Sequence, residues 1–510
     1  MKIIRHAGNW AVLAIEQVFN KIFGNPLNPF YHLGSLTFYF FWIVLVSGIY
    51  VFIFFETNLA GAYASVEYMT VQQWWLAGLM RSLHRYASDA AIITIFLHMF
   101  REFCRDRYRG VRWFSWFTGV PTLWIVVMLG ISGYWLVWDM LAQYVAITTA
   151  ELIDWIPMLP GSMVFNFLEG NITDRFFTLM AFLHLLGLPV GLVFLLWTHV
   201  SRISQIDFYP PRPLAWGSLV ALTILSLLKP AISHSPAQLN QSPTVLHLDW
   251  FYLNIYPLVD LVGPGWAWGI ASGTTLLLLI LPWLPPRGEK PRAEVNLEHC
   301  SGCGQCAQDC PYGAITMQRR SDGRTFEFES RMEDSLCTSC GICTGSCASS
   351  NPFRVSKGVL KSGIEMPWYG AEELRTRTRE KLSALSGAAR IIVYGCENGL
   401  DFRVLDTLGV AILMVPCSGM LPPSLLDFAL KKGAAGVVVA GCREGDCFHR
   451  FGNRWVNARL RGERKPHLFA GTERERITVF WGGKAESHEL LERVRSFRDE
   501  LEKREGFPHA

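Results

Sequence analysis

Charged residues are scarce in this chain of 510 residues: Asp, Glu, Lys and Arg make up 18% of it, and the formal net charge is +4. A net charge this small argues against a nucleic-acid partner. Before Cys300 there is one cysteine, Cys104, which we interpret as a small hydrophobic residue that closes a membrane helix. Met1–Phe30 lacks a compact apolar run with a small-residue cleavage site, so no cleavable signal peptide is expected there.

Hydrophobic residues make up 50% of the chain, and most lie before about Leu284, beyond which charges are dense. Trp10–Phe23 has apolar residues at helical intervals with charges between them, which predicts a helix on a membrane surface. Six segments of about bilayer length follow, of which the fifth is the shortest. We expect these membrane-spanning helices near Ser35–Phe55, Leu76–Phe100, Phe117–Trp138, Phe176–Val200, Leu214–Leu228 and Trp266–Leu284.

Loop charges predict the orientation of these helices. Basic residues follow the second, fourth and sixth spans, and acidic residues occupy the other loops. Because Lys and Arg are retained on the cytoplasmic side, we expect the N-terminus and the cysteine-rich half in the cytoplasm and the spans in the cytoplasmic (inner) membrane. The basic residues are Arg101, Arg105, Arg107, Arg109, Arg112, Arg202, Arg212, Arg287, Lys290 and Arg292, and the acidic ones are Glu56, Glu67, Glu151, Asp154, Glu169, Asp249 and Asp260.

Two pairs of histidines lie inside the apolar segments. His84 and His98 are 14 residues apart, and His184 and His199 are 15 apart. At 3.6 residues per turn, each pair returns to nearly the same helix face with an axial offset of about 21 Å. Two such helices offer two His/His pairs, an arrangement that can hold two stacked b-type haems. The alternative is buried histidines satisfied by neighbours, but ionisable groups at this depth are costly and usually functional.

Two motifs surround these histidines, Arg81-Ser-Leu-His84-Arg85 and Gly130-Ile-Ser-Gly133-Tyr-Trp-Leu-Val-Trp-Asp139. They resemble the cytochrome b/b6 family of quinol-oxidising complexes, and the 14/15 spacing resembles its b6 branch. The resemblance covers about residues 10–284 and includes a shortened form of the subunit that completes the b6 type. It implies an outer haem between His84 and His184 and a cytoplasmic-side haem between His98 and His199.

The resemblance also implies roles for arginines and glycines. Arg81 and Arg85 are expected to neutralise haem propionates, although they could instead extend to the outer interface. Glycines recur at a step of 14 residues in the first and third spans, which would let a flat porphyrin pass close to those helices. Ordinary helix-packing glycines are the alternative. The four glycines are Gly34, Gly48, Gly119 and Gly133.

Two positions depart from the family pattern. The b6 branch binds a third haem through a Cys that follows a Tyr, whereas here Tyr31 is followed by His32, so that thioether cannot form. His32 could contact a quinone or haem, or be an ordinary interfacial histidine. The family's outer quinol site uses a Pro-Glu-Trp-Tyr segment, where this chain reads Leu248-Asp249-Trp250-Phe251. We predict that Asp249 accepts the proton from quinol, with a solvated loop carboxylate as the alternative.

Eight cysteines form two runs with ferredoxin spacing. The first run is C-x2-C-x2-C-x3-C-P and ends at Cys310-Pro311, and the second repeats the spacing without the proline. In two-cluster ferredoxins the fourth Cys of each run binds the other cluster, whereas tetrahedral zinc would not explain eight cysteines in this phase. We assign one [4Fe–4S] centre to Cys300, Cys303, Cys306 and Cys347, and the other to Cys310, Cys337, Cys340 and Cys343.

Four β-rich runs alternate with helix-like stretches near the C-terminus and predict a small parallel sheet. They are Ile391–Tyr394, Ala411–Val415, Gly436–Ala440 and Ile477–Trp481, and no G-x-G-x-x-G motif follows any of them, so no dinucleotide site of that type is indicated. The last four cysteines follow strand ends, which converge at one sheet edge. They fit a [2Fe–2S] centre, with zinc as a weaker alternative. These cysteines are Cys396, Cys417, Cys442 and Cys447.

The segments around these cysteines carry a second resemblance. Cys396-Glu-Asn398, Pro416-Cys-Ser-Gly419-Met and Gly441-Cys442 with Cys447-Phe-His resemble the iron–sulfur delta subunit of methyl-viologen-reducing hydrogenase. The resemblance covers about residues 388–480. It implies electron transfer to a flavoprotein of the heterodisulfide-reductase type.

The expected architecture is therefore multidomain. An all-α transmembrane haem-binding bundle precedes an α+β 2[4Fe–4S] ferredoxin domain and an α/β parallel-sheet [2Fe–2S] domain. The expected boundaries are 1–213 for the four-helix haem domain, 214–286 for the C-terminal cytochrome b part, 293–353 for the ferredoxin, 354–387 for a connector and 388–510 for the last domain.

The expected function is membrane electron transfer through two haems b, two [4Fe–4S] clusters and one [2Fe–2S] cluster. The chain would connect the quinone pool, or an outer-face donor, to a soluble cytoplasmic oxidoreductase such as a flavoprotein. One alternative is the core of a bc-like bifurcating complex with a Rieske-type or cytochrome c partner, and another is a non-catalytic anchor and conduit subunit. Whether the chain is itself an enzyme stays open, and a homodimer is implied by family analogy alone.

Overall fold

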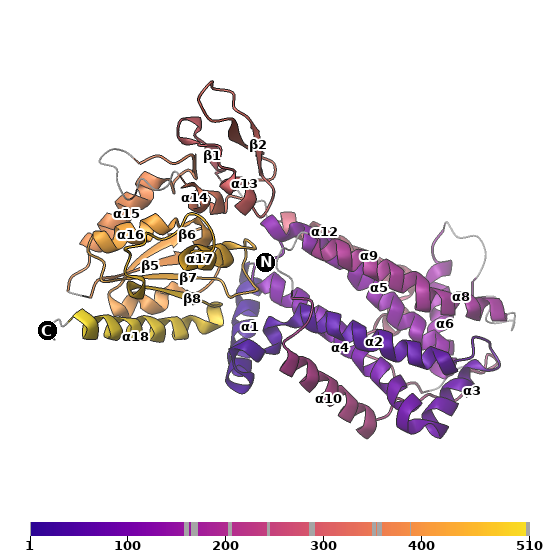
Figure 1. Cartoon of the computed structure of the whole chain (residues 1–510). Coiled ribbons are helices and arrows are strands. Elements are labelled where there is room, and N and C mark those ends of the chain that lie inside the picture. Colours follow the sequence, from indigo (N-terminus) through magenta and orange to yellow (C-terminus); the bar gives the residue numbers. More distant parts are fainter. Residues whose placement is uncertain are drawn as a thin grey trace. The chain divides into compact units, whose positions relative to one another are not determined.

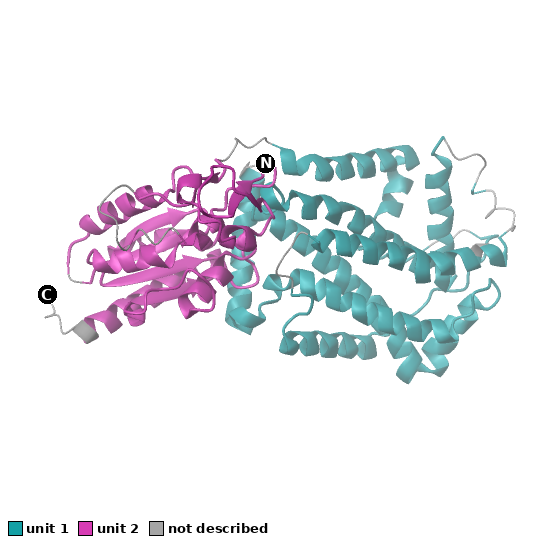
Figure 2. Ribbon diagram, turned by 45° about the horizontal axis from the view of Figure 1, so that its top comes forward, with its two compact units in different colours: residues 1–202, 207–286 teal, residues 203–206, 287–510 magenta. Residues whose placement is uncertain are grey.

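The chain folds into two compact units, one for each half of the sequence. The first contains residues 1–202 and 207–286, and the second contains residues 203–206 and 287–510 (Figure 2). The expected membrane exit at 285–288 lies outside the described residues, as do Glu169, Arg202 and Lys290. The computed structural model describes residues 2–157, 163–164, 172–201, 207–241, 245–284, 291–348, 353, 360–387 and 389–505.

The first unit is helical (Figure 1). Short 3-10 and π-helical turns join its longer helices. The last such turn, Leu281–Trp283, precedes the second unit in the sequence. The helices are α1 Lys2–Phe23, α2 Leu33–Phe54, α3 Ala62–Glu67, α4 Leu79–Cys104, α5 Trp113–Val137, α6 Met140–Asp154, α8 Asp174–Phe182, α9 Leu188–Val200, α10 Arg212–Leu228, α11 Ile255–Val262 and α12 Pro264–Ile280.

All six segments expected to span a membrane are helical. Four helical stretches are long and apolar enough to cross one: Leu33–Phe54, Gly110–Val137, Phe177–Val200 and Pro264–Trp283. The other two expected spans correspond to α4, a continuous helix of 26 residues that carries charged side chains, and to α10, an apolar helix of 17 residues. Membrane passage by α4 and α10 stays a prediction.

A wide turn interrupts the helix that carries His184. Leu183–Gly187 forms π-helical hydrogen bonds between α8 and α9. Pro189 follows at the start of α9 and has no N–H to donate into the preceding turn, which favours this widening. A π turn accommodates one extra residue, so the 15 residues from His184 to His199 rise about as far as 14 residues of a regular helix. The 14-residue spacing of His84 and His98 and the 15-residue spacing of His184 and His199 thus correspond to nearly equal distances along the two helices.

The N-terminal helix α1 is amphipathic, as expected from its sequence. Trp10 and Ile22 are 71% and 65% exposed, whereas Val12 and Glu16 are buried. The Glu16 carboxylate accepts a hydrogen bond from Arg101 Nε at 2.9 Å and another from Arg105, both at the C-terminal end of α4. Helix α1 is therefore fixed to the bundle by a buried ion-pair network, while its apolar outer face stays uncovered within the described residues.

The second unit begins with the ferredoxin-like part. Two antiparallel pairs, β1 Glu294–Val295 with β4 Ile364–Glu365 and β2 Ile315–Arg319 with β3 Phe328–Met332, frame two short helices. The helices are α13 Gln305–Asp309 and α14 Ile342–Ser346, and each lies inside one of the two cysteine runs. Each is preceded by a glycine at φ +73°, Gly304 and Gly341, so both runs turn in the same way.

The C-terminal part is an α/β domain with a parallel sheet, as expected. The strands are β5 Ile391–Cys396, β6 Ala411–Val415, β7 Gly436–Gly441 and β8 Ile477–Trp481, in the order β6-β5-β7-β8. The helices are α15 Ala371–Ser383, α16 Pro423–Lys431, α17 Gly452–Arg461 and α18 Ser487–Glu505.

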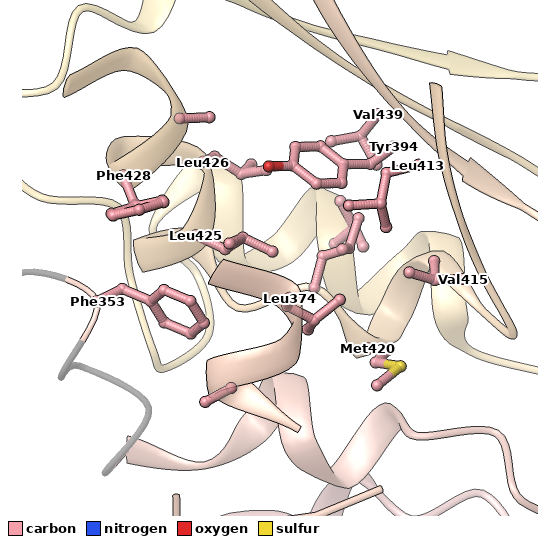
Figure 3. Close-up of a cluster of buried hydrophobic side chains, with 14 of the residues drawn as sticks. Phe353, Leu374, Tyr394, Leu413, Val415, Met420, Leu425, Leu426, Phe428 and Val439 are labelled. Atoms are coloured by element: carbon pink, nitrogen blue, oxygen red, sulfur yellow. The ribbon is translucent and has the colours of Figure 1, made fainter. Parts of the chain in front are cut away.

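Alternate residues of the central strands build two cores. Tyr394 packs with Leu374 of α15 and Leu425 of α16 on one face (Figure 3). Val393, the neighbouring residue of β5, packs with Phe497 of α18 on the other face. Because successive side chains of a strand point to opposite faces, an apolar run such as β5 can serve both cores.

A buried arginine connects the ferredoxin-like part to the α/β domain. Arg459 of α17 is 1% exposed, and its Nη2 lies 2.7 Å from both Asp309 Oδ2 and Ser346 Oγ. Its Nη1 donates to the carbonyl oxygen of Gly419 at 2.9 Å, and Arg464 Nε donates to Asp309 Oδ1 at 2.5 Å. Helix α13, which contains Cys306 and ends just before Cys310, is therefore held by charged side chains of the C-terminal domain.

We expect Arg459→Met to destabilise the second unit, because it leaves Asp309 buried with one of its two cationic partners removed. Loss of one partner of a buried ion pair costs about 3–5 kcal/mol. The measurement is the urea midpoint for loss of visible iron–sulfur absorbance in the full-length protein. Arg461→Met, an exposed arginine of the same helix, is the control. Equal midpoints for the two variants would contradict the structural role.

Candidate functional site

The first unit brings the four predicted histidines together in pairs. The ring centroids of His84 in α4 and His184 in the wide turn lie 6.2 Å apart. Two metal–imidazole bonds of about 2 Å each, plus half of each ring, fit this separation. His98 and His199 lie close enough to interact electrostatically. The structure thus pairs His84 with His184 and His98 with His199, and the two pairs lie at different positions along the helices.

Hydrogen bonds orient three of these rings through the same atom. His84 Nδ1 lies 2.9 Å from the Val44 carbonyl oxygen, to which it can only donate. His184 Nδ1 lies 3.0 Å from Ser132 Oγ, and His199 Nδ1 lies 3.4 Å from Thr118 Oγ1. A partner at Nδ1 leaves Nε2 as the nitrogen that can bind iron.

Each histidine ring faces one of the four predicted glycines. A Cβ built on Gly48 would lie 2.7 Å from His84 Cε1, and one on Gly34 would lie 3.9 Å from His98 Cε1. On α5, a Cβ at Gly133 would lie 3.1 Å from His184 Cε1, and one at Gly119 would lie 3.2 Å from His199 Cε1. Space beside the rings of His84, His184 and His199 therefore depends on the missing side chains, whereas Gly34 lies at an ordinary contact distance from His98. The donor set and this space fit a flat, doubly ligated porphyrin.

The two predicted arginines lie near His84 in the sequence of α4. Arg81 donates to Ser233 Oγ at 2.8 Å and to Thr70, and it lies 3.6 Å from Glu67. Arg85 contacts carboxylates instead of standing free, because its guanidinium lies 3.2 Å from both Asp89 and Asp249. Propionate binding by either arginine stays a prediction.

Asp249, in the segment that precedes α11, is buried and contacts polar side chains of α4 and α5. Its side chain is 2% exposed. Tyr134 OH donates to Oδ2 at 2.5 Å, the Phe251 N–H donates to Oδ1 at 2.5 Å, and Arg85 lies 4.7 Å over the Tyr134 ring. The alternative of a solvated loop carboxylate does not describe this position. The Nε2 of His32 lies 3.0 Å from the Pro26 carbonyl oxygen.

The eight ferredoxin-like cysteines lie in two groups. The charges of Cys300, Cys303 and Cys347 act on Cys306, and those of Cys310 and Cys337 act on Cys340 and Cys343. Burial raises the pKa of Cys306 to about 11 and that of Cys340 to about 12, and neighbouring sulfurs add to both effects. The grouping of the thiols, rather than their pKa values, supplies the ligands for two metal clusters, which bind as the thiols lose their protons.

The last four cysteines converge at the carboxyl edge of the parallel sheet, and all four are buried. Cys396 Sγ lies 3.9 Å from Cys442 Sγ. Thiol–thiol hydrogen bonds connect Cys396 and Cys447 to both Cys417 and Cys442, and they lower the pKa of Cys396 and Cys447 well below the usual thiol range. A Cβ on Gly452 would collide with Cys417 Sγ, so the absence of a side chain there keeps space beside the sulfurs.

One ferredoxin-like group lies directly against this edge. Cys340, Ile342 and Cys417 form one buried cluster, which Tyr312 and Trp455 cover. Tyr312 OH lies 3.2 Å from His449 Nδ1, and Arg450 donates to the Pro311 carbonyl oxygen at 2.7 Å. The residues after Cys310 thus contact the residues after Cys447.

Two features of these sites were not predicted from the sequence. Asp89 joins Arg85 one helical turn further along α4, and a carboxylate four residues after an arginine in an apolar helix is a signal that could have found it. Arg459 has no such signal, because its contacts are with Asp309 and Ser346, far away in the sequence.

Comparisons with known proteins agree with this division of the chain. Residues 18–207 match the model of the Cytochrome b/b6/petB family, residues 299–351 match a 4Fe-4S dicluster domain, and residues 406–504 match the delta subunit of methyl-viologen-reducing hydrogenase. The resemblances drawn from the motifs are thereby confirmed. The first match ends before Asp249, and the last begins after Cys396.

Similar individual proteins belong to the same family. Cytochrome b6 of Gracilaria tenuistipitata var. liui is 31% identical over 194 residues, which cover 37% of this chain and 88% of that protein. Cytochrome b6 of Oltmannsiellopsis viridis is 29% identical with the same coverage. A solved structure titled Hyperthermophilic respiratory Complex III covers 50% of this chain and 75% of its own, with 20% identity and a TM-score of 0.42. The chain belongs to the cytochrome b/b6 family, and after its cytochrome b region it continues into a 4Fe–4S dicluster domain and a domain like the delta subunit of methyl-viologen-reducing hydrogenase.

Proposed function

We propose that this chain is an integral membrane protein that carries electrons between a quinone pool, or an outer-face donor, and a soluble cytoplasmic oxidoreductase. The observation that carries the proposal is the presence, on one chain, of two histidine pairs faced by glycines and three sets of four cysteines. Haem b and iron–sulfur clusters supply one-electron redox chemistry when bound. The protein supplies their ligands, their spacing and surroundings that exclude water.

The residues divide among five redox centres. His84 with His184, and His98 with His199, hold two haems b, and the histidines present Nε2 because Nδ1 is engaged on three of the four rings. The two ferredoxin-like groups hold two [4Fe–4S] clusters, and the sheet-edge set holds a [2Fe–2S] cluster. The ring of thiol contacts around Cys396 and Cys447 supports the last assignment.

Within the second unit, the contacts support an order of transfer. The Cys310, Cys337, Cys340 and Cys343 group is the one next to the [2Fe–2S] set, because Cys340 and Cys417 share a buried cluster. The Cys300, Cys303, Cys306 and Cys347 group is therefore the outlying one. The route runs from the [2Fe–2S] set through the neighbouring [4Fe–4S] cluster to the outlying one, or in reverse.

The outer end of the route is a quinol pocket at Asp249. Arg85, Tyr134 and the Phe251 N–H fix this carboxylate in the membrane unit, where it can accept a hydrogen bond from a quinol hydroxyl. The loop charges support a cytoplasmic location for the second unit, in the inner membrane of a respiratory chain. A soluble flavoprotein is the partner that the hydrogenase-like domain favours.

We expect Gly48→Val to abolish binding of the haem between His84 and His184, because the added side chain would displace the His84 ring. The haem content of purified protein should fall from two to one, measured as pyridine haemochrome per chain. Gly217→Val in α10, where a Cβ meets nothing within 4 Å, should keep both haems. Retention of two haems by Gly48→Val would contradict the site.

We expect Asp249→Asn to slow quinol-driven haem reduction in membranes, since general base catalysis contributes about 100-fold or more. Dithionite-reduced haem spectra should not change. Asp260→Asn is the matched control, because Asp260 also accepts a tyrosine hydroxyl, that of Tyr144 at 2.5 Å, but is exposed on α11. An unchanged rate in Asp249→Asn would favour the anchor and conduit function.

We expect the paramagnetic resonance signal of the reduced [2Fe–2S] cluster to be broadened by its neighbour. Cys340→Ala should remove the broadening, because it disrupts the adjacent [4Fe–4S] cluster, whereas Cys303→Ala in the outlying group should keep it. Broadening that survives Cys340→Ala would contradict the order of the centres. Iron well below two haem irons plus ten cluster irons per chain would contradict the cofactor assignment.

A further inference from the structure

A second carboxylate lies inside the membrane unit and has no role so far. Asp89 is in the middle of α4, between His84 and His98, and its side chain is 14% exposed. A carboxylate at this depth is costly and is retained where it serves a function. Its neighbours identify that function.

Arg85 joins Asp89 to Asp249. Its Nε lies 3.2 Å from Asp89 Oδ2, and its Nη2 lies 3.2 Å from Asp249 Oδ2. One guanidinium therefore serves two carboxylates, and the three side chains together carry a net charge of −1. In a low-dielectric interior, uptake of one proton neutralises this group, which is electrostatically favourable.

The two carboxylates differ in their hydrogen bonds. Asp249 accepts from Tyr134 OH, from the Phe251 N–H and from Arg85, and these donors stabilise its ionised form. Asp89 accepts from Arg85, while its Oδ1 is buried and has no hydrogen-bond partner among the described residues. A buried anionic oxygen without a donor is costly, and a proton bound there removes the charge.

We propose that Asp89 is the final acceptor of the quinol proton within the protein. Asp249 accepts the hydrogen bond from the quinol and fixes Arg85 and Tyr134. This inference rests on the proposed quinol site. It assigns the two steps of proton transfer to two carboxylates, where the sequence pattern alone indicated one.

The proton and electron balance is as follows for a membrane quinol. Oxidation to the quinone releases two electrons and two protons. A haem b held by one of the histidine pairs would take up each electron. For each electron that the quinol loses, one of its O–H bonds breaks, and the proton passes by way of Asp249 to Asp89 Oδ1. Asp89 releases the first proton to the outer aqueous side before it accepts the second. Arg85 keeps its own proton throughout, because a guanidinium is not deprotonated in proteins.

The groups around Asp89 are few within the described residues. Arg85 and Tyr86 are on the same helix, Tyr134 is on α5, and Asp249 and Tyr252 come from the segment before α11. Tyr252 OH is engaged by Ser88, at 2.8 Å from both its hydroxyl and its carbonyl oxygen. No Lys or His bonds to Asp89 among the contacts described, so the proton has a carboxylate as its final acceptor on this route.

The test uses Asp89→Asn, Asp89→Glu and Asp249→Asn in the full-length protein with both haems, and duroquinol as the electron donor. Asp89→Asn should slow haem reduction about 100-fold, and Asp89→Glu should recover most of the rate. A second readout is the infrared difference spectrum on reduction by duroquinol. It should contain a protonated-carboxyl band that Asp89→Asn removes and Asp89→Glu shifts. Dithionite-reduced haem spectra identify variants that fail to assemble.

The outcomes separate the two levels of the proposal. Slow Asp89→Asn and Asp249→Asn variants, with the carboxyl band absent from Asp89→Asn, support the inference. A normal rate in Asp89→Asn beside a slow Asp249→Asn, or a band that persists in Asp89→Asn, overturns the role of Asp89 and leaves the quinol site intact. Normal rates in both variants overturn the quinol site itself, and the role of Asp89 with it.

Discussion

Imidazole rings in a low-dielectric interior must have both nitrogens engaged, and the first unit is organised around this requirement. One nitrogen of His84, His184 and His199 faces a carbonyl or hydroxyl oxygen of a neighbouring helix. The other nitrogen needs a metal, and a flat macrocycle around that metal needs space beside each ring. Gly48 of α2 and Gly119 and Gly133 of α5 supply that space beside three of the rings. Ligand orientation and helix packing are thus two results of the same constraint.

The charged group of Arg85, Asp89 and Asp249 depends on a related requirement, that buried charges be paired. Arg85, Asp89 and Asp249 come from two distant parts of the chain, and none of the three would be stable at this depth alone. Their mutual contacts neutralise most of the charge but not all of it. The remaining negative charge of this group is the basis for the proposed uptake of a proton, which a fully neutral pair would not favour.

Much of the fold follows from the sequence, because its signals are periodic. The apolar segments, the strands from Ile391 onward and the cysteine runs have spacings that identify helices, a parallel sheet and cluster sites directly. The wide turn at Leu183–Gly187 was not predicted, because one extra residue in a long helix leaves its composition unchanged. The contacts of Asp89 and Arg459 were not predicted either, since they depend on which distant segments meet, and a single sequence carries no record of that.

The salt bridge between Arg459 and Asp309 has a consequence for how such a chain can be assembled from parts. Sequence comparison divides the second unit into two modules, but the acidic residue before Cys310 and the arginine of α17 belong to one electrostatic unit. A ferredoxin module without an acid at that position would leave a cation buried in the C-terminal domain. Exchange of either module alone would therefore fail unless its counterpart changed as well, so the two are expected to be inherited together.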